Sequence, residues 1–503
     1  MLEQIKKSFE IFSGRNAFCI NGEYYTYSQF SKIVSKIRHE LENNCKNEKL
    51  IGIISNESPD IESYASIYAC WFGGYGFVPI NLNDPLDRNL SILKQTEIKT
   101  ILSRKQDERV NQLSLAAGSR IIITHDLNDS EINLNTPIIT GEEIAYILYT
   151  SGSTGVPKGV PITWNNLNSF IDAFFKLGYD IDENDKFLQM FDLTFDFSVI
   201  CYTVPLCKGA SVYTIEAEGV KYANVYMALE SKEITFACLV PVILSYLRPY
   251  FEDINLEKLK YSLFCGETLY ADLAKEWGKC IPNGKIINAY GPTEATVFCL
   301  IYDFNGNDSS EKKYNGGVSI GKPMLNMEAI VIDENLKPVS KGTIGELCLA
   351  GRQLTTEYLK NPGKNKEVFF NYRINGIEKR FYRTGDLAFI DNDDFFMFAG
   401  RLDTQIKVQG FRIELGEIEH FTREFTNITN VAAVSYKNRI GIILIHLFVE
   451  NYSGKVYDIE KYLRIKVPYY MVPSEITVLP TFPLNTNGKV DRKRLTEIAQ
   501  SKV

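Results

Sequence analysis

A run rich in glycine and hydroxyl side chains, Tyr149–Val160, places the tightest constraint on how this chain folds. It directly follows a short apolar stretch, Ile144–Leu148, which predicts a buried strand. The glycines let the backbone bend and approach a ligand closely, and Lys158 adds a positive charge. A loop of this kind at the end of a strand suits the oxygens of a polyphosphate.

This run has two alternative interpretations. A flexible Gly/Ser turn has a similar composition and remains an alternative on these residues alone. The P-loop of nucleotide triphosphatases requires Gly, four residues and then Gly-Lys-Ser/Thr. Here Lys158 is followed by Gly159, so that class is excluded.

The segment before the run alternates helical and strand patterns. Apolar residues from Phe30 to Leu41 recur at spacings of three and four, which predicts a helix capped at Ser28. Strands are predicted at 50–54 and 77–80, with a helix over 61–72 between them. Strand–helix–strand repetition predicts an α/β fold with a parallel sheet.

Length, charge and residue counts exclude several classes of protein. A chain of 503 residues predicts at least two domains. Its net charge of −7, without a long basic run, argues against nucleic acid as a partner. The first residues lack an apolar signal core, and the late apolar run 440–449 is too short to span a bilayer. We therefore expect no membrane insertion and a cytoplasmic location.

Cysteine and histidine usage excludes further kinds of site. Ten cysteines without a Cys-x-x-Cys pair indicate reduced, mostly buried thiols. Only four histidines occur, and none lies in a candidate motif. The sequence therefore argues against a Ser-His-Asp mechanism and against a His-rich metal site.

An acidic residue lies between two phenylalanines in the segment Phe195-Asp196-Phe197-Ser198. Burying a carboxylate without a cationic partner is costly. The residues alone leave two alternatives open: a solvated loop aspartate, or a carboxylate that binds a cation.

Four polar segments follow in the second half of the chain. They are Asn288–Glu294, Tyr382–Leu387, Gly400–Lys407 with Gly410–Leu415, and Pro483–Arg492. Glu294 offers the kind of oxygen that Mg²⁺ binds together with phosphate. Asp386 suits two hydroxyl donors, and Arg401 carries a fork of donors for ribose or phosphate oxygens. Turns and solvated hairpins are the alternatives for these segments.

Together these segments resemble, in order, the motifs of the adenylate-forming superfamily, which comprises acyl-CoA synthetases, luciferases and peptide-synthetase adenylation domains. The run Tyr149–Val160 resembles its phosphate loop. Two positions depart from the family pattern, because Asn81 stands where aspartate is usual and Glu357 where glycine is usual.

The resemblance implies the adenylate-forming enzyme fold. Residues 1–402 would form a large N-terminal α/β domain of sheets flanked by helices. Residues 403–503 would form a small mobile α+β domain that swings about a hinge at Asp403. The active site would lie at the junction of the two domains.

The resemblance also implies an ATP site with Mg²⁺. The residues expected to hold ATP or AMP are Thr150, Ser151, Gly152, Ser153, Thr154, Gly155, Lys158, Asn288, Ala289, Tyr290, Gly291, Thr293, Asp386, Arg401 and Lys489. Lys489, Thr150, Thr154 and Glu294 are the expected catalytic residues, and Glu294 is the expected Mg²⁺ ligand.

The substrate is implied to be an amino acid, because Asp196 matches the aspartate that holds an α-ammonium group in this superfamily. The other expected wall residues are apolar or small: Phe197, Ile200, Cys238, Leu263, Cys265, Ala289, Val297 and Phe298. Because they include no second charge, a charged amino-acid side chain would be left unpaired. The bulk of Phe197 and Phe298 should shrink the pocket, which favours a small amino acid.

Three runs, Phe195–Val199, Phe264–Glu267 and Tyr290–Val297, together with the length of the chain, most resemble the stand-alone D-alanine–D-alanyl carrier protein ligases within the superfamily. In those enzymes the cysteine at the position of Cys265 bears on chirality, whereas a purely structural cysteine is the alternative. D-alanine is therefore the predicted substrate.

The implied reaction has two halves. A carboxylate attacks the α-phosphorus of ATP and expels pyrophosphate; the aminoacyl group then passes to a phosphopantetheine thiol of a separate acyl or peptidyl carrier protein, or to CoA. Three alternatives remain open: a natural-product enzyme for another small or apolar L-amino acid, an acyl- or aryl-CoA ligase, and a non-catalytic scaffold that binds carrier protein.

Overall fold

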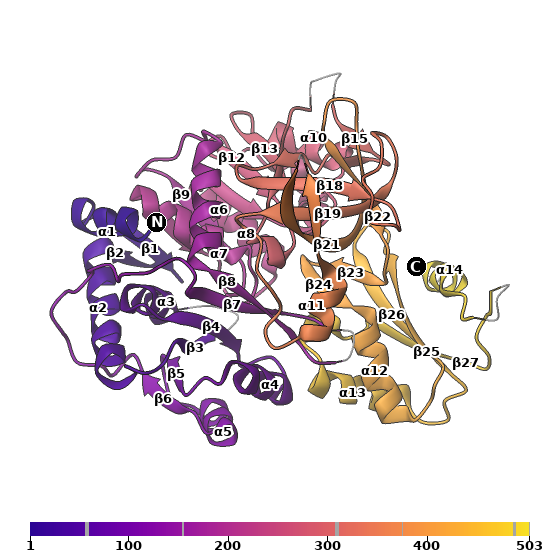
Figure 1. Ribbon diagram of the computed structural model, residues 1–503, viewed down its shortest axis with the longest axis horizontal. Helices are drawn as coiled ribbons and strands as arrows, with labels where there is room; N and C mark the ends of the chain where they lie inside the picture. The colour runs from indigo at the N-terminus through magenta and orange to yellow at the C-terminus, as the bar shows by residue number, and fades with distance from the viewer. Residues whose placement is uncertain (56–59, 153–154, 307–310, 375, 486–488, 502–503) are drawn as a thin grey trace.

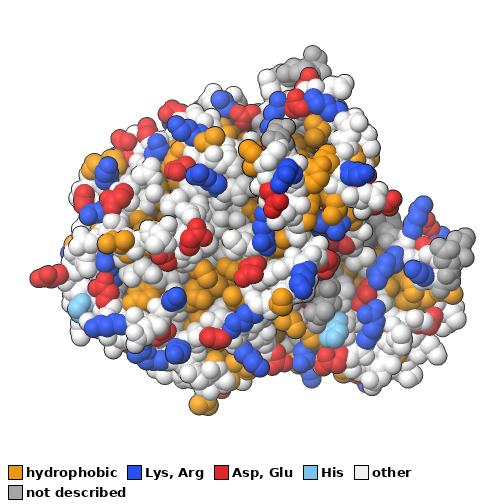
Figure 2. Space-filling view, viewed as in Figure 1, with side chains coloured by type: hydrophobic (Ala, Val, Ile, Leu, Met, Phe, Trp, Pro, Cys, Tyr) orange, Lys and Arg blue, Asp and Glu red, His pale blue; other side chains and the backbone are white. Residues whose placement is uncertain are grey.

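The computed structural model describes residues 1–55, 60–152, 155–306, 311–374, 376–485 and 489–501. These residues form two large sheets, a third smaller sheet, and a C-terminal segment, residues 405–501, that lies against the rest (Figure 1). The predicted α/β fold class is confirmed. Lys and Arg side chains are interspersed with Asp and Glu on the face shown in Figure 2.

The six-stranded sheet carries the predicted phosphate loop. Its strands, in spatial order, are β6 (Arg120–Ile123), β5 (Thr100–Ser103), β3 (Leu50–Ser55), β4 (Gly76–Asn81), β7 (Ile144–Thr150) and β8 (Lys158–Thr163). All neighbours pair in parallel except β7 and β8, which pair antiparallel with Thr150 opposite Lys158. The glycine-rich run therefore connects the ends of two buried, paired strands.

The nine-stranded sheet gathers the other motifs. Its strands, in spatial order, are β17 (Lys322–Pro323), β14 (Leu300–Phe304), β13 (Lys285–Tyr290), β12 (Tyr261–Phe264), β11 (Phe236–Leu239), β9 (Lys186–Gln189), β10 (Ser211–Thr214), β1 (Asn16–Ile20) and β2 (Glu23–Thr26). The strands from β13 through β1 pair in parallel. Cys265 and Gly291 directly follow β12 and β13, so both lie at the carboxyl edge of this sheet.

Helices cover and separate these two sheets. They are α1 (Leu2–Ile11), α2 (Tyr27–Asn44), α3 (Ile61–Gly73), α4 (Leu86–Thr96), α5 (Glu108–Ala117), α6 (Trp164–Lys176), α7 (Ser198–Lys208), α8 (Lys221–Ser231), α9 (Pro241–Leu247) and α10 (Ala271–Cys280). Helix α3 is buried on every side from residue 61 to 72. The Trp71 indole N–H donates to the Ala145 carbonyl at 3.0 Å, and its ring contacts Trp164 and Tyr202. This tryptophan ties α3 to β7, α6 and α7.

The third sheet lies between the nine-stranded sheet and the C-terminal segment (Figure 1). It contains β18 (Met327–Ile332), β19 (Gly345–Gly351), β21 (Ile377–Ile390), β20 (Phe369–Ile374) and β22 (Phe396–Arg401), accompanied by the small pair β15 (Lys313–Tyr314) and β16 (Gly317–Val318) and by α11 (Pro362–Val368). Strands β21 and β22 carry Asp386 and Arg401, which pair in register.

The C-terminal segment has its own apolar core. It contains the hairpin β23 (Gln405–Val408) and β24 (Phe411–Glu414), the sheet β25 (Val431–Lys437), β26 (Ile443–Glu450) and β27 (Glu475–Leu479), and helices α12 (Leu415–Thr426), α13 (Val456–Lys466) and α14 (Arg492–Ser501). The buried cluster around Ile413, Leu447 and Leu463 is made of residues 408–471. The domain boundary at Asp403 stays a prediction.

Several local expectations have clear outcomes. The predicted cap at Ser28 is wrong, because α2 is capped by Thr26, whose hydroxyl accepts from the Gln29 amide at 3.2 Å. All ten cysteines are buried free thiols, as predicted. Among the described residues, the helices are too short or too polar for any of them to cross a bilayer.

We expect Trp71→Phe to lower the free energy of unfolding by about 1–3 kcal/mol, because the Ala145 carbonyl loses its buried donor and a cavity forms. Urea unfolding followed by circular dichroism measures the change. Leu115→Ala, at an exposed site, serves as the control. A loss no larger than that of the control would contradict the connecting role of Trp71.

Candidate active site

A buried ion pair joins the C-terminal hairpin to the loop after β13. The Glu294 side chain is fully buried, and Nη1 of Arg412 lies 3.0 Å from each of its carboxylate oxygens. The hydroxyl of Tyr358 also donates to this carboxylate. Burial alone would raise the pKa of Glu294, but the Arg412 guanidinium holds it below its ordinary value. The carboxylate therefore stays charged inside the protein.

The described part of the predicted phosphate loop contacts the same hairpin and the helix that follows it. The Ser151 hydroxyl donates to the carbonyl oxygen of Arg412 at 2.8 Å. The Gly152 amide donates to Oε2 of Glu417 at 3.2 Å. The loop is thus covered by β24 and α12. Ser153 and Thr154 lie outside the described residues.

Lys158 also lies in this interface between the loop and the C-terminal hairpin. Its Nζ lies 3.3 Å from Oε1 of Glu414, and only 8% of its side chain is exposed. Burial, together with the charge of Arg412, lowers the pKa of Lys158, and Glu414 opposes that shift. Nearby, the Thr150 hydroxyl is buried and has no hydrogen-bond partner among the described residues. Lys158 and Thr150 therefore form a small buried set of polar donors at the end of β7.

Asp196 lies buried at the start of α7. The Thr293 hydroxyl donates to its Oδ2 at 2.5 Å. Burial raises the pKa of Asp196 to about 6, opposed in part by the Thr293 hydrogen bond and the charge of Lys407. This carboxylate lines a cavity of about 40 Å³ together with Cys265 and Val297. Because the carboxylate is buried beside a cavity, the alternative of a solvated loop aspartate is excluded.

The hairpin tip closes this cavity. Gly410 has φ +86° and lines the cavity, and its amide donates to Oε1 of Glu267 at 3.1 Å. A Cβ added at Gly410 would lie 2.7 Å from Cγ1 of Val240 and 3.2 Å from the ring of Phe195. Glycine is therefore required for the hairpin to approach this closely.

The predicted wall residues divide into three groups. Asp196, Phe197, Cys265 and Val297 line the cavity. Ile200, Cys238, Leu263 and Phe298 are fully buried behind it and are not among its described lining residues, and Ala289 lines a different, larger cavity. The ring of Phe298 packs on Phe170, Phe174 and Phe197, with centroids 5.0, 6.4 and 6.3 Å away.

An unusual backbone segment lies where Val297 and Phe298 part, one at the cavity and the other in the apolar core. Thr296 and Val297 have φ of 54° and 72°, in the left-handed region that β-branched residues rarely adopt. The Thr296 hydroxyl donates to the Gln353 carbonyl at 2.5 Å. This turn accompanies the placement of Val297 at the cavity and of Phe298 in the apolar core behind it.

Five of the residues expected to hold ATP or AMP line a larger cavity of about 670 Å³. Asn288, Ala289, Tyr290, Asp386 and Arg401 all line it. The Tyr290 hydroxyl donates to Asp386, and Arg401 forms an ion pair with the same carboxylate. Arg401 also lies 2.7 Å from the carboxylate of the predicted hinge residue, Asp403.

Lys489, a predicted catalytic residue, does not lie with Thr150 and Glu294 in this structure. It is exposed, and its amide donates to Oδ1 of Asn485 at 3.0 Å. It precedes α14, which lies at the outer edge of the C-terminal segment in Figure 1. Among the described residues that line the cavities beside Asp196, Lys489 does not occur.

The residues present fit a magnesium ion and phosphates. The described residues contain no cluster of three or more His, Cys, Asp or Glu that could hold a metal. Mg²⁺ commonly takes only one or two protein carboxylates and completes its shell with phosphate and water. Glu294 is such a carboxylate, and the Arg412 guanidinium now occupies a position suited to a cation. The unpartnered Thr150 hydroxyl suits a phosphate oxygen.

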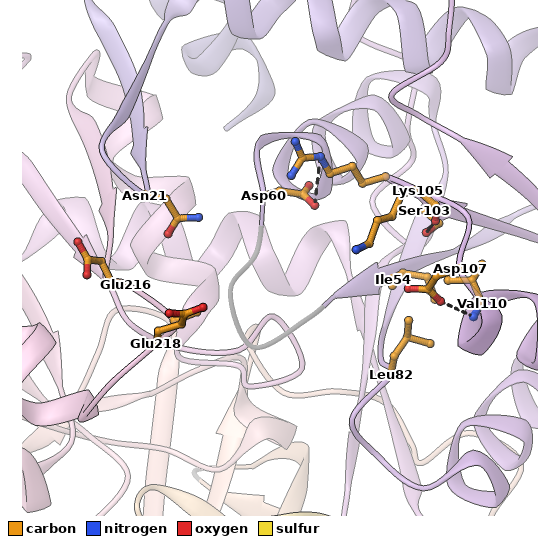
Figure 3. Close-up of a pocket in the computed structure, with 12 residues that line it drawn as sticks. Asn21, Ile54, Asp60, Leu82, Ser103, Lys105, Asp107, Val110, Glu216 and Glu218 are labelled. Carbon is orange, nitrogen blue, oxygen red and sulfur yellow. Dashed lines mark hydrogen bonds and ion pairs between the residues drawn. The ribbon is translucent and has the colours of Figure 1, made fainter.

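Another cavity, of about 430 Å³, lies at the carboxyl ends of β3 and β5 (Figure 3). Asp60 and Asp107 on its wall cap helices α3 and α5, accepting from the Ser63 and Val110 amides. Of the described residues that line it, none belongs to the motifs above. We therefore place the functional site at the hairpin, not here.

The sequence did not predict a role for the charged residues of the C-terminal segment that contact the candidate site. Arg412 and Glu414 lie in a motif segment for which a solvated hairpin was the alternative interpretation. No role was predicted for Glu417 or Lys407. The alternation of charged and apolar residues along β23 and β24 was the available signal. It places the apolar side chains on one face of the hairpin and Lys407, Arg412 and Glu414 on the other face.

Comparison with known proteins identifies the family of this chain. Residues 5–359 match the family described as AMP-binding enzyme. Zwittermicin A synthase ZmaJ of Bacillus cereus is 31% identical, over 95% of this chain and 91% of that protein. The D-alanine–D-alanyl carrier protein ligase of Bacillus licheniformis is 29% identical, over 99% of each chain. Tyrocidine synthase 1 of Brevibacillus parabrevis is also 29% identical, but this chain spans 44% of its length.

Among solved structures, the Vibrio cholerae adenylation domain AlmE, in complex with glycyl-adenosine-5'-phosphate, has a TM-score of 0.88. Its sequence is 23% identical, and the match covers 99% of this chain and 97% of that one. The shared fold and the family match confirm the predicted superfamily. The chain belongs to the family of AMP-binding enzymes.

Proposed function

We propose that this chain activates a small amino acid. It joins the substrate carboxylate to the α-phosphate of ATP, releases pyrophosphate, and passes the aminoacyl group to the phosphopantetheine thiol of a carrier protein. D-alanine is the proposed substrate. The observation that carries the proposal is the buried carboxylate of Asp196 on the wall of a small cavity.

A buried carboxylate favours a substrate that brings a positive charge. Asp196 is shielded from water, and its hydrogen bond from Thr293 satisfies only part of its capacity as an acceptor. The α-ammonium group of an amino acid would supply a charge-assisted hydrogen bond here. A fatty or aryl acid would leave the carboxylate without that bond, which disfavours an acyl- or aryl-CoA ligase.

The size of the cavity favours a small side chain. About 40 Å³ leaves room for roughly three water-sized groups beside Asp196. Val297 and Cys265 bound this space with small side chains. The charged residues Asp386, Arg401, Lys407 and Arg412 also line the cavity, but none of them is a predicted wall residue. The similarity to a D-alanine–D-alanyl carrier protein ligase supports D-alanine. An enzyme that activates another small amino acid for the synthesis of a natural product is the second candidate, favoured by the similarity to zwittermicin A synthase ZmaJ.

Adenylation requires charge compensation and alignment more than proton transfer, because a carboxylate is already a nucleophile. Thr150 and Lys158 would bind phosphate oxygens, and Glu294 would hold Mg²⁺, whose charge offsets that of the triphosphate. We assign Lys489 to this step. Its exposed position here requires the C-terminal segment to turn about Asp403 before Lys489 reaches the nucleotide.

We expect ATP–pyrophosphate exchange to be fastest with D-alanine in a panel of D- and L-amino acids, glycine, fatty acids and benzoates. Asp196→Asn should raise the KM for the amino acid on the order of 10²-fold, because the ammonium loses a buried charged partner. The exposed Asp180→Asn is the control. Exchange driven by a fatty or aryl acid and insensitive to Asp196→Asn would instead identify an acyl- or aryl-CoA ligase.

The pH dependence of substrate binding follows from Asp196. Its pKa is raised to about 6, so the carboxylate is ionised above pH 6 and becomes protonated as the pH falls through 6. The KM for the amino acid should therefore rise about tenfold per pH unit below 6 and stay flat above pH 7. Exchange assays between pH 5 and 8 measure this. An identical pH profile in Asp196→Asn would show that another group is responsible.

Val297→Ala should widen the cavity and relax the size limit. We expect the ratio of kcat/KM for D-2-aminobutyrate to that for D-alanine to rise about tenfold, the scale for one methylene group. Ile200→Val changes a residue behind the wall and is the matched control. If both variants shift the ratio equally, Val297 does not limit the size of the substrate.

A further inference from the structure

The cavity of about 430 Å³ lies at the carboxyl ends of strands from both large sheets (Figure 3). Its lining residues end or follow β3 and β5 of the six-stranded sheet, and follow β1 and β10 of the nine-stranded sheet. The neighbours β3 and β5 lead in opposite directions, because β3 continues through α3 to β4 on one side and β5 through α5 to β6 on the other. Ligands of open α/β sheets commonly bind at such a switch point.

Two helices begin at this cavity, and an aspartate already occupies the N-terminus of each. Asp60 accepts from the Ser63 amide at 2.8 Å at the start of α3. Asp107 accepts from the Val110 amide at 3.0 Å at the start of α5. These carboxylates fill the position in which nucleotide-binding folds place a phosphate. The cavity therefore disfavours nucleotides and other polyphosphates.

Charged side chains of opposite sign lie on opposite walls of the cavity. Figure 3 shows Glu216 and Glu218 on one side and Lys105 on the other. Among the residues that the structure describes, none of these three side chains has an ion-pair partner, whereas the neighbouring Arg104 lies 3.5 Å from the Glu62 carboxylate. The two walls therefore suit a ligand with an ammonium group at one end and a carboxylate at the other.

Hydrogen bonds from side chains to the backbone hold both charged walls in place. The side-chain amide of Asn224, in α8, donates to the carbonyl oxygens of Glu216 and Glu218, at 3.0 and 2.6 Å. The Ser103 hydroxyl donates to the carbonyl oxygen of Lys105 at 2.7 Å. The backbone that carries these charges is thus ordered before a ligand arrives, which lowers the cost of binding.

The volume and the apolar lining of the cavity indicate the size of the ligand. A compact space of 430 Å³ is about 9 Å across, which an extended chain of about three residues spans at about 3.3–3.6 Å per residue. The two charges of a free α-amino acid are separated by one carbon and are too close together to reach both walls. Ile54, Leu82 and Val110 also line the cavity and suit small apolar side chains.

We propose that this cavity binds a short zwitterionic peptide of about three residues. Its ammonium group lies at Glu216 and Glu218, and its carboxylate lies at Lys105. The cavity shares no described lining residue with the cavity beside Asp196 or with the larger one that Asp386 lines. The inference therefore does not depend on the substrate or the reaction proposed above.

Titration calorimetry of the full chain with trialanine tests the site. We expect a Kd on the order of 0.1–1 mM, in the range of a ligand of this size with exposed ion pairs. Trialanine with an acetylated amino end, or with an amidated carboxyl end, should bind about 5-fold more weakly because each lacks one charge. Spermidine, which carries ammonium groups but no carboxylate, should also bind more weakly. No saturable binding of trialanine, equal binding of the three peptides, or tighter binding of spermidine would overturn the proposal.

Charge reversal assigns each end of the peptide to its wall. Lys105→Glu should weaken the binding of trialanine about tenfold without weakening that of the amidated peptide. Glu218→Lys should weaken the binding of trialanine without weakening that of the acetylated peptide. Both residues are exposed, so the variants should fold, and Lys32→Glu, at an exposed site on α2, is the matched control. Equal losses for blocked and unblocked peptides would contradict the assignment.

The variant Asp196→Asn separates this cavity from the proposed substrate site. A peptide bound at Asp196 would lose the partner of its ammonium group, whereas a peptide bound at the ends of β3 and β5 should keep its affinity. Hydrogen–deuterium exchange of the wild-type chain should slow several-fold at residues 103–107 and 214–220 when trialanine is added. Binding that is lost in Asp196→Asn, or slowing confined to residues 405–414, would overturn the proposal and leave amino-acid activation intact.

Discussion

The buried carboxylate of Glu294 is the constraint on which the arrangement of this protein depends. It has no exposure to water, and it is held by Arg412 and Tyr358. A carboxylate so placed stays ionised only with a cation beside it, because an unpaired buried charge is strongly destabilising. Arg412 supplies that charge here, so this ion pair ties the C-terminal segment to the loop after β13.

The geometry of parallel strands explains why distant motifs meet at one place. Gly291 and Cys265 directly follow neighbouring strands of the nine-stranded sheet, and Asp196 follows β9, which lies in the same parallel set. Their carboxyl ends share one edge. The β7–β8 connection of the other sheet brings Thr150 and Lys158 to the same region, so the chemistry lies between two sheets that α3, α6 and α7 bind together.

Elements with strong apolar patterns could be predicted from the sequence. Helix α3 and strand β4 were expected within one residue of their observed ends, because uninterrupted apolar runs leave little choice of burial. The cap of α2 was misplaced by two residues, since Thr26 and Ser28 are both good caps and only the Gln29 amide decides between them. Boundaries of this kind depend on single hydrogen bonds.

Some residues of the candidate site could be predicted from the sequence and others could not, for a physical reason. Asp196, Cys265 and Val297 were predicted as wall residues, and they line one small cavity. Phe298 was predicted beside them but is buried in the apolar core, next to positive φ angles at Thr296 and Val297. Such angles in β-branched residues leave no sequence signal. The roles of Arg412 and Glu417 were also unreadable, because they arise only when the hairpin docks against a loop more than 250 residues away.

A crystal structure of the protein with Mg²⁺ and a non-hydrolysable ATP analogue tests the coupling between Glu294 and the C-terminal segment most directly. We predict that the guanidinium of Arg412 leaves Glu294, that the metal binds this carboxylate, and that the glycine-rich run contacts the β- and γ-phosphates. An Arg412–Glu294 pair that stays intact, with the nucleotide bound elsewhere, would contradict this coupling.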